Sequence, residues 1–353
     1  YPQPEAAQEK GENFRITDEH LGEGGKREKF QRNLAAIITL QSIEKEKRHA
    51  AKAEQETLSK YIGWGGLPEV FDKDNNSYAG EFAQLKSVLS EDEYEMARAS
   101  TLNAHYTSPT VIKAIYDTVE RMGFTTGNIL EPACGTGNFF GLLPDSMTDS
   151  RLYGVELDSI TGRIAKQLYP DANIAITGFE KAEFPDNFFD LAIGNVPFGQ
   201  YQVNDKAYNK LGFNIHNYFF AKALDQVRPG GVVAFVTSRY TMDAKDSTVR
   251  RYLAQRAELL GAIRLPNNAF RANAGTGPMW CPTSCFCKSG TVRWTSPRTG
   301  PKPAGPRKAS RSTSIFSTTR RWCWGGPPPK APNMASRTTP WSPSRGWSWP
   351  TSC

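Results

Sequence analysis

Two short segments hold the residues whose types and spacing could do chemistry. Residues 131–140 read Glu-Pro-Ala-Cys-Gly-Thr-Gly-Asn-Phe-Phe, and residues 195–198 read Asn-Val-Pro-Phe. In the first segment, Gly135 and Gly137 let the backbone turn sharply and approach a ligand without a Cβ in the way. In the second segment, Asn195 could accept hydrogen bonds from an amino group. Together, the two segments predict a methyl donor held over the glycine turn and an amine held beside that donor.

The Asn-x-Pro-aromatic segment suits an sp² amine, which is a poor nucleophile because its lone pair is delocalised. Hydrogen bonds from the amine to Asn195 and to a backbone carbonyl of Val196 or Pro197 would draw the nitrogen toward sp³ geometry. Pro197 fixes the backbone, and Phe198 offers a flat face on which the target ring can stack. A proline-containing turn after a strand would explain the same residues without any chemistry.

Short apolar runs place both segments after strands of an α/β fold. The run 128–130 ends at Glu131, and the run 189–194 leads directly into Asn195. This order predicts a doubly wound, mostly parallel sheet. Further strands are expected at 151–158, 172–177, 232–237 and 259–265.

Residues after the second and third strands predict how the adenosine part of a cofactor would be held. Glu156 follows the glycine turn at about the 20-residue separation from which an acid reaches ribose hydroxyls. Asp158 can instead start the next helix, where an acid suits the helix dipole. Phe179 and Glu180 would lie beside the adenine, although a solvent-facing turn explains them equally well.

These residues together resemble the motifs of the amino-group DNA methyltransferases, which use S-adenosylmethionine and methylate N6 of adenine. Residues 131–137 are similar to the family's cofactor motif, Glu156 to the acid after its second strand, and residues 195–198 to its Asn-Pro-Pro-aromatic motif. The resemblance implies a Rossmann-like methyltransferase fold, S-adenosylmethionine as cofactor and DNA as partner. In the first motif it implies cofactor contacts for Glu131, Gly135, Thr136 and Gly137.

The resemblance extends upstream and has one departure. Residues 103–109, Asn-Ala-His-Tyr-Thr-Ser-Pro, are similar to the family's segment before the first strand. This similarity implies that Tyr106 and Thr107 lie near the methionine end of the cofactor. Val196 stands where the family usually has proline, which puts full activity in question.

A polar loop with aromatic residues follows the Asn-x-Pro-aromatic segment. In an amino-methyltransferase this loop faces the target base and its strand, so Tyr201, Tyr208 and Lys210 could stack on bases and meet phosphates. Ordinary surface-loop composition explains these residues about as well.

A narrower resemblance concerns residues 61–71, Tyr-Ile-Gly-Trp-Gly-Gly-Leu-Pro-Glu-Val-Phe. They are similar to the region before the methylase domain in very large methylase–helicase proteins of bacterial conjugative elements and phages. The resemblance implies a helicase region in the full-length protein. The alternative is a simple turn that closes the preceding helix.

Two other functions remain open. A methyltransferase for an RNA amine or for a protein glutamine side chain would share the same Asn-x-Pro-aromatic logic. A non-catalytic, DNA-engaging or anti-restriction module of a mobile element would also fit, and the departure at Val196 favours it. Methyl transfer from labelled cofactor to DNA, RNA and a peptide separates these alternatives.

The sequence divides into four expected parts. Residues 1–28 are polar and predicted to be disordered, and residues 29–89 form a helical extension with the Gly-Trp-Gly-Gly turn. Residues 90–275 form the methyltransferase domain. Residues 276–353 are a basic tail rich in Pro, Ser, Arg and Trp, which we predict to be disordered.

The tail distorts the composition of the chain. From Thr276 onward lie 12 of the 43 Lys and Arg residues but none of the 36 Asp and Glu residues. The body is therefore net acidic, and the formal charge of +7 gives no argument for nucleic-acid binding. Five of the six cysteines and seven of the eight tryptophans also lie in the tail.

We interpret the tail as the product of a frameshift near residues 275–277. Met279 and Trp280 have single codons, and reading one base earlier permits a segment of the form Asp-Val-Val-Ser-Asp-Ile-Leu-Phe-Leu-Gln. That segment has the pattern of a buried strand, which the visible Pro-Met-Trp-Cys-Pro-Thr-Ser-Cys-Phe-Cys lacks. The alternatives are a basic arm that binds phosphates and a metal site, which the spacing of Cys281, Cys285 and Cys287 supports poorly.

The sequence gives no sign of a membrane or metal protein. It has no apolar run long enough to span a membrane and no signal-peptide pattern. Cys134 alone in the body gives no disulfide framework, and the four scattered histidines suggest no metal cluster. We expect a cytoplasmic bacterial protein of unknown oligomeric state.

Overall fold

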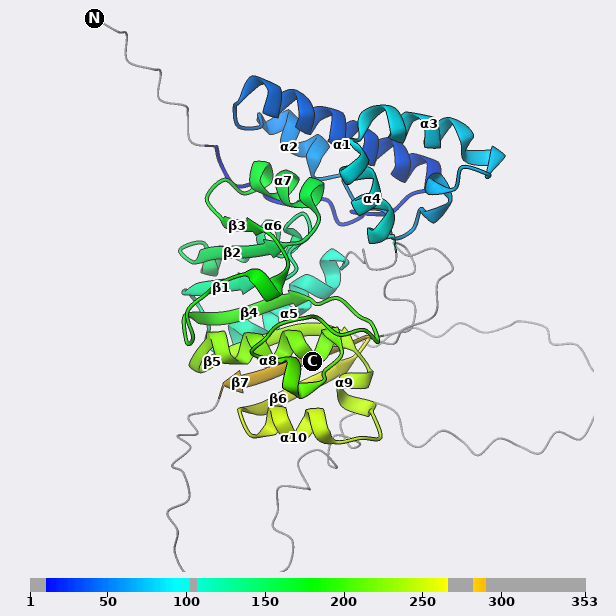
Figure 1. Ribbon diagram of the computed structural model, residues 1–353. Helices are drawn as coiled ribbons and strands as arrows, with labels where there is room; N and C mark the ends of the chain where they lie inside the picture. The colour runs from blue at the N-terminus through cyan, green and yellow to red at the C-terminus, as the bar shows by residue number, and fades with distance from the viewer. Residues whose placement is uncertain (1–10, 102–106, 266–281, 290–353) are drawn as a thin grey trace, which may run out of the picture. The chain divides into compact units, whose positions relative to one another are not determined.

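The computed structural model describes residues 11–101, 107–265 and 282–289, which form a helical extension and an α/β core (Figure 1). The extension contains α1 Lys26–Glu46, α2 Lys52–Leu58, α3 Ala79–Val88 and α4 Glu91–Ser100. The core contains α5 Pro109–Arg121, α6 Asn138–Gly141, α7 Ser159–Leu168, α8 Ile215–Gln226, α9 Tyr240–Asp243 and α10 Thr248–Ala254. Short 3₁₀ helices are η1 Pro68–Phe71, η2 Asn76–Tyr78, η3 Asp145–Met147, η4 Phe179–Lys181 and η5 Asn209–Leu211. None of these helices is long and apolar enough to cross a membrane.

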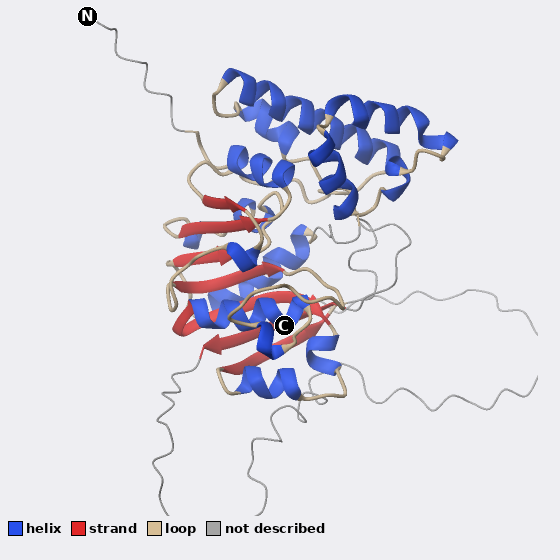
Figure 2. Cartoon of the chain, in the orientation of Figure 1, coloured by secondary structure: helices blue, strands red, loops and turns tan. Residues whose placement is uncertain are grey.

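The core is built on one sheet (Figure 2), which within the described residues has seven strands in the order β3-β2-β1-β4-β5-β7-β6. The strands are β1 Asn128–Glu131, β2 Arg151–Glu156, β3 Asn173–Ile176, β4 Phe189–Asn195, β5 Val227–Ser238, β6 Ala257–Arg264 and β7 Pro282–Ser289. Neighbours from β3 to β5 pair in parallel, while β7 is antiparallel to both β5 and β6. The predicted doubly wound, mostly parallel sheet is confirmed.

Both faces of the parallel strands are buried, because alternate residues of a strand point to opposite sides. On β4, Leu191 and Ile193 pack with α5, α6 and α7, while Ala192 packs with α8. On β5, Val233 and Phe235 also face the α8 side. Helices therefore cover both faces and leave the carboxyl ends of the strands as the place for a site.

The Gly-Trp-Gly-Gly turn lies at the centre of the core of the extension. Trp64 is fully buried, and its ring lies 5.3 Å from that of Phe71 between centroids. Asn33 of α1 holds the turn on both sides: its Nδ2 donates to the Gly63 carbonyl at 2.6 Å, and its Oδ1 accepts from the Ile62 N–H at 2.9 Å. The turn thus fixes the chain against α1 in addition to following α2.

The first residues correct one prediction. Segment 1–28 was expected to be disordered, but residues 12–16 contact the folded chain. Phe14 is buried and its N–H donates to the last carbonyl of α7 at 2.7 Å, while the N–H of Ile16 donates to the last carbonyl of α6 at 2.9 Å. Burial of these two apolar side chains stabilises the ordered form of an otherwise polar segment. Residues 1–10 lie outside the described residues.

A second correction concerns the tail. We expected no strand from the visible residues after 275, yet β7 pairs along its length with β5 and with β6. The ladder uses backbone N–H and C=O groups, so it forms without the alternating apolar pattern that this segment lacks. β7 also falls on the stretch for which the shifted reading frame predicts a strand. The prediction of disorder for the rest of 276–353 lies outside the described residues.

Candidate active site

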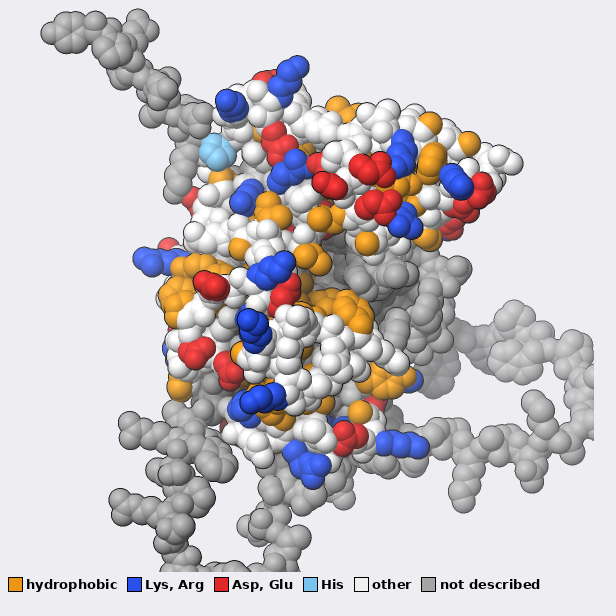
Figure 3. All heavy atoms as spheres, viewed as in Figure 1, with side chains coloured by type: hydrophobic (Ala, Val, Ile, Leu, Met, Phe, Trp, Pro, Cys, Tyr) orange, Lys and Arg blue, Asp and Glu red, His pale blue; other side chains and the backbone are white. Residues whose placement is uncertain are grey.

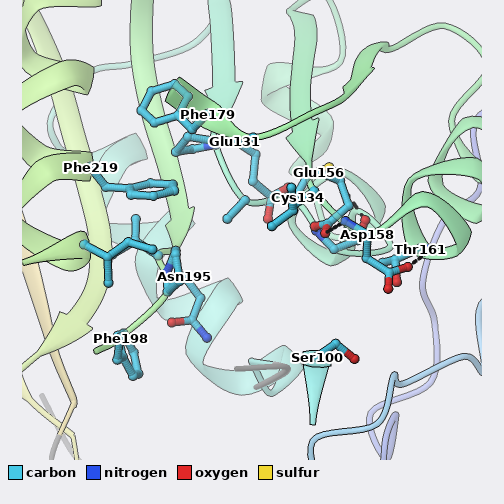
Figure 4. Close-up of a pocket in the computed structure, with 18 of the residues that line it drawn as sticks. Ser100, Glu131, Cys134, Glu156, Asp158, Thr161, Phe179, Asn195, Phe198 and Phe219 are labelled. Carbon is cyan, nitrogen blue, oxygen red and sulfur yellow. Dashed lines mark hydrogen bonds between the residues drawn. The ribbon is translucent and has the colours of Figure 1, made fainter. Parts of the chain in front are cut away.

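A cavity of about 530 Å³ opens at the carboxyl ends of the parallel strands. Ligands of open α/β sheets bind at this edge. The ends of β1, β2 and β4 bring Glu131, Glu156 and Asn195 to it, and Phe179 of η4 and Phe219 of α8 complete one side. Figure 3 shows the hollow between the extension and the sheet, and Figure 4 shows the side chains that line it.

The glycine turn depends on backbone conformations that other residues rarely adopt. Gly135 has φ 57° and Gly137 has φ 84°, both in the left-handed region. A Cβ on Gly137 would also lie only 2.5 Å from the ring of Tyr169. Gly135 lines the cavity, whereas Gly137 and the buried Thr136 lie behind the turn, outside its lining. Any contribution of Thr136 and Gly137 to cofactor binding therefore runs through the shape of the turn.

Glu156 and Asp158 have different roles at the end of β2. The two carboxylate oxygens of Glu156 accept from the N–H groups of Gly135 and Asp158, each at 2.8 Å. Asp158 caps α7 by accepting from the N–H of Thr161 at 2.8 Å. Because each oxygen of Glu156 has a further lone pair, the same carboxylate can also accept from the two hydroxyls of a ribose.

The cavity is acidic. Burial raises the pKa of Glu131 well above its usual range, with the Glu156 carboxylate adding to the effect, and burial raises the pKa of Glu156 to about 7. The buried Oε2 of Glu131 has no hydrogen-bond partner among the described residues. Asp158 and Glu180 also line the cavity, while none of its described lining residues is Lys, Arg or His. Such a site fits a cationic ligand with N–H donors and disfavours a pyrophosphate.

The buried Cys134 is not a nucleophile. Burial raises the pKa of its thiol well above the usual value, and the carboxyl groups of Glu131 and Glu156 add to the effect, so the thiol stays protonated. No group of three or more His, Cys, Asp or Glu in the described part of the chain could hold a metal ion. The tail cysteines of the alternative metal site lie outside the described side chains.

The predicted adenine side contains two stacked rings and a buried lysine. Phe179 and Phe219 have ring centroids 4.9 Å apart, with planes tilted by 36°. Lys222 of α8 donates to the carbonyls of Phe179 at 2.7 Å and Glu180 at 3.3 Å, and it pairs with Asp205 at 3.2 Å. Lys222 therefore joins the adenine side to the loop after residue 198. Lys222 was not among the predicted site residues, because it belongs to no sequence motif.

The Asn-x-Pro-aromatic segment continues directly from β4. Asn195, Pro197 and Phe198 all line the cavity, and Figure 4 shows the Asn195 amide and the Phe198 ring on the same side of it. Val196 is buried, and its N–H donates to the Val236 carbonyl of β5 at 3.1 Å. A proline here could not make this bond. The departure from the family pattern thus extends the β4–β5 ladder by one hydrogen bond.

The structure separates the three residues predicted to contact substrate. Tyr201 lines the cavity and is 45% exposed. Tyr208 lies away from the cavity lining, and its hydroxyl donates to Asp225 at 2.9 Å. Lys210 lies in η5 and is exposed, also outside the lining. Of the three, only Tyr201 therefore lies at the cavity, and substrate contacts by all three stay a prediction.

The outer wall of the cavity was not foreseen. Four residues of the extension line it: Gly63, Met96, Ala99 and Ser100. Thr107 lines it as well, in keeping with the resemblance, whereas Tyr106 lies outside the described residues. The wall was missed because its residues belong to no local motif and reach the cavity only through the tertiary fold.

Comparisons with known proteins give a consistent picture. Residues 69–270 match the Eco57I restriction-modification methylase family. The chain is 31% identical over 196 residues to Defense against restriction protein B of Escherichia phage P1, covering 54% of this chain and 8% of that protein. It is 28% identical over 137 residues to Modification methylase CviBIII of Paramecium bursaria Chlorella virus NC1A, covering 37% and 36%. A solved structure from Listeria monocytogenes, described as a class I S-adenosylmethionine-dependent methyltransferase, is 16% identical with a TM-score of 0.48, covering 77% and 91%.

Proposed function

The chain belongs to the Eco57I restriction-modification methylase family and uses S-adenosylmethionine, and on that premise we propose that it methylates the N6 amine of adenine in DNA. The observation that carries the proposal is one continuous cavity with two chemically different ends. Glu156 lies at one end and Asn195 and Phe198 lie at the other, with Glu131 of β1 between them. A methyl donor and an amine can therefore meet inside a single site.

The acidic end fits the cofactor. When bound, S-adenosylmethionine supplies an electrophilic methyl group on a sulfonium, and its amino acid part carries an ammonium group. The unpaired oxygen of Glu131 can accept from that ammonium, and Glu156 can accept from the ribose hydroxyls. Phe179 and Glu180 then lie beside the adenine. The chain holds the cofactor by carboxylates and rings, without a phosphate-binding cation in the described lining.

The amide end fits the amine. The side-chain oxygen of Asn195 and a backbone carbonyl next to Pro197 accept hydrogen bonds from the NH₂, which localises the nitrogen lone pair. With the methyl donor bound beside it, the exposed lone pair would form the new N–C bond while the S–C bond of the donor breaks, and the surplus proton would then leave the nitrogen. Phe198 stacks on the base. In duplex DNA the adenine must first leave the helix, which costs a few kcal/mol that this stacking helps to offset.

We further propose that the chain is one part of a larger protein from a mobile element, with DNA as partner and a helicase region elsewhere in the full-length protein. The chain corresponds to only 8% of the phage relative, which supports a longer context. Its sequence relatives above are phage and viral proteins, which supports a mobile origin. A cytoplasmic bacterial location would follow from this role.

Methyl transfer from isotopically labelled S-adenosylmethionine tests the proposal. The chain is incubated with duplex DNA, RNA or a glutamine-containing peptide, and labelled products are separated after digestion. We expect label in DNA, in N6-methyladenine. Label in N4-methylcytosine would overturn the choice of base, and label only in RNA or peptide would overturn the choice of DNA. Cofactor binding without transfer to any acceptor would instead favour a non-catalytic module.

A further inference from the structure

Helix α4 of the extension has two unlike faces. Tyr94 and Ala97 are buried in the core of the extension. Met96, Ala99 and Ser100, at i, i+3 and i+4, share another face. Asp92 and Glu93 lie on the same side one turn earlier, but none of the charged residues of the helix lines the cavity. The last turn of this charged helix therefore presents three uncharged residues, Met96, Ala99 and Ser100, to the cavity.

The uncharged residues in the last turn of α4 are joined at the cavity by a residue from elsewhere in the extension. Met96, Ala99 and Ser100 all belong to the cavity wall, together with Gly63 of the Gly-Trp-Gly-Gly turn. Figure 4 shows Ser100 facing the cavity across from the acidic residues. The sulfur of Met96 accepts from the N–H of Ser159 at 3.2 Å, at the start of α7 and next to the ribose side of the site. The wall therefore stands beside the end of β2 and the start of α7, where Glu156 and Asp158 lie.

Polar contacts fix the extension to α7. Arg163 of α7 pairs with Glu44 of α1 at 3.2 Å and also with Glu93 of α4. On the other side, Gln55 of α2 donates to the Gln167 carbonyl at 3.1 Å. Because Asp158 caps the same α7, these contacts set the distance between the wall and the ribose-binding acids.

We propose that α4 is part of the cofactor site, with Met96, Ala99 and Ser100 contacting bound S-adenosylmethionine. The inference rests on the proposed use of the cavity and adds residues to it. The uncharged wall excludes water from the cofactor on the side that the sheet leaves open, and lower local polarity strengthens its contacts with Glu131 and Glu156. The extension is then a structural part of the methyltransferase, and the core alone binds cofactor weakly.

Two matched substitutions in the full chain test the wall. Ala99→Phe places a ring on the cavity face of α4, and Ala53→Phe places the same ring on an exposed position of α2. Titration calorimetry measures S-adenosylmethionine affinity for both and for the unmodified chain. We expect Ala99→Phe to weaken binding by about tenfold or more, as overfilling a packed site does, and Ala53→Phe to leave it within about twofold.

The outcomes separate the wall from the proposed function. Cofactor affinity unchanged by Ala99→Phe would overturn the inference, as would equal weakening by both substitutions, which would indicate a general effect on the extension. A folded, unmodified chain that binds no S-adenosylmethionine would overturn the proposed function instead. Initial methylation rates over a range of cofactor concentrations give a second measurement: a contact with the cofactor predicts a raised KM for S-adenosylmethionine in Ala99→Phe with little change in kcat.

Discussion

The two ends of the cavity are held in place by different physical means. At the cofactor end, Glu156 is fixed by two backbone N–H groups and Asp158 by its cap on α7, so the groups are set by hydrogen bonds to backbone. At the amine end, the buried side chain of Val196 holds the segment against the core, while Asn195 and Phe198 face the cavity. Carboxylates held by backbone N–H groups form the cofactor end. Packed apolar side chains and one side-chain amide form the amine end.

This difference predicts that binding and chemistry can be separated by substitution. Changes at the acidic end should act on cofactor affinity, because the carboxylates touch the cofactor before and during the reaction alike. Changes at the amide end should act on the transfer step, because the amine is polarised most strongly as the new bond forms. Four substitutions or conditions test this division, beginning with the largest expected effect.

Asn195→Ala should remove most of the methyl transfer. Loss of the acceptor leaves the amine lone pair delocalised, and loss of one such positioned group lowers kcat by about 100-fold or more. Affinity for S-adenosylmethionine should stay within about threefold. Initial rates with DNA and calorimetry with cofactor measure the two quantities, with the exposed Asn76→Ala as the matched control. Loss of both quantities together would contradict the division between the ends.

Glu156→Ala should act on cofactor binding. The substitution removes acceptors for the ribose hydroxyls, and hydrogen bonds to a charged group contribute about 1.5–3 kcal/mol, so the Kd should rise by about 10-fold to 100-fold. At saturating cofactor the transfer rate should be largely kept. Glu56→Ala, on an exposed part of α2, serves as the control. An unchanged Kd would remove Glu156 from the site.

Cofactor affinity should rise with pH. Burial raises the pKa of Glu156 to about 7, so from pH 6 to pH 8 the carboxyl passes from mostly protonated to mostly ionised. The ionised form accepts from both ribose hydroxyls, and the Kd should fall by up to about tenfold over this interval. The folded protein itself loses stability as the pH rises from 4.5 to about 7, because a raised acid pKa favours the protonated native state. If a Glu156→Gln variant showed the same pH dependence of the cofactor Kd, a group other than Glu156 would be responsible for that dependence.

Val196→Pro should have the smallest effect, and on stability. It restores the residue that the family resemblance implies but removes the N–H that donates to Val236. Loss of one such hydrogen bond lowers the free energy of unfolding by about 1 kcal/mol. Denaturant titration measures that loss, and methyl transfer should change by only a few-fold. A large gain in transfer rate would show that Val196 limits the amine end.

The sequence predicted the parallel half of the sheet because its strands and their ends follow local rules. Glu131, Glu156 and Asn195 each follow a short apolar run, and parallel strands bring such ends to one edge. The observed strand boundaries differ from the predicted ones by a few residues. β5 begins at Val227 instead of the expected 232, because Val227 pairs with Phe189 beyond an irregularity in the ladder.

The sequence failed where tertiary contacts decide the structure. The wall of Met96, Ala99 and Ser100 reaches the cavity only because Arg163 holds α4 and α1 against α7. Lys222 was missed for the same reason, since its three partners come from two distant segments. β7 shows the opposite case: the visible residues lack a strand pattern, and the pairing of their backbone with β5 and β6 places them.

The division between the two ends is tested most directly by single-turnover methylation with cofactor already bound. Unmodified chain and Asn195→Ala are loaded with labelled S-adenosylmethionine to equal occupancy, mixed with excess duplex DNA, and sampled for labelled N6-methyladenine. The account predicts equal loading at similar cofactor concentrations and transfer at least about 100-fold slower in Asn195→Ala. Equal transfer rates in the two loaded proteins would contradict the assignment of the amine end and, with it, the proposed reaction.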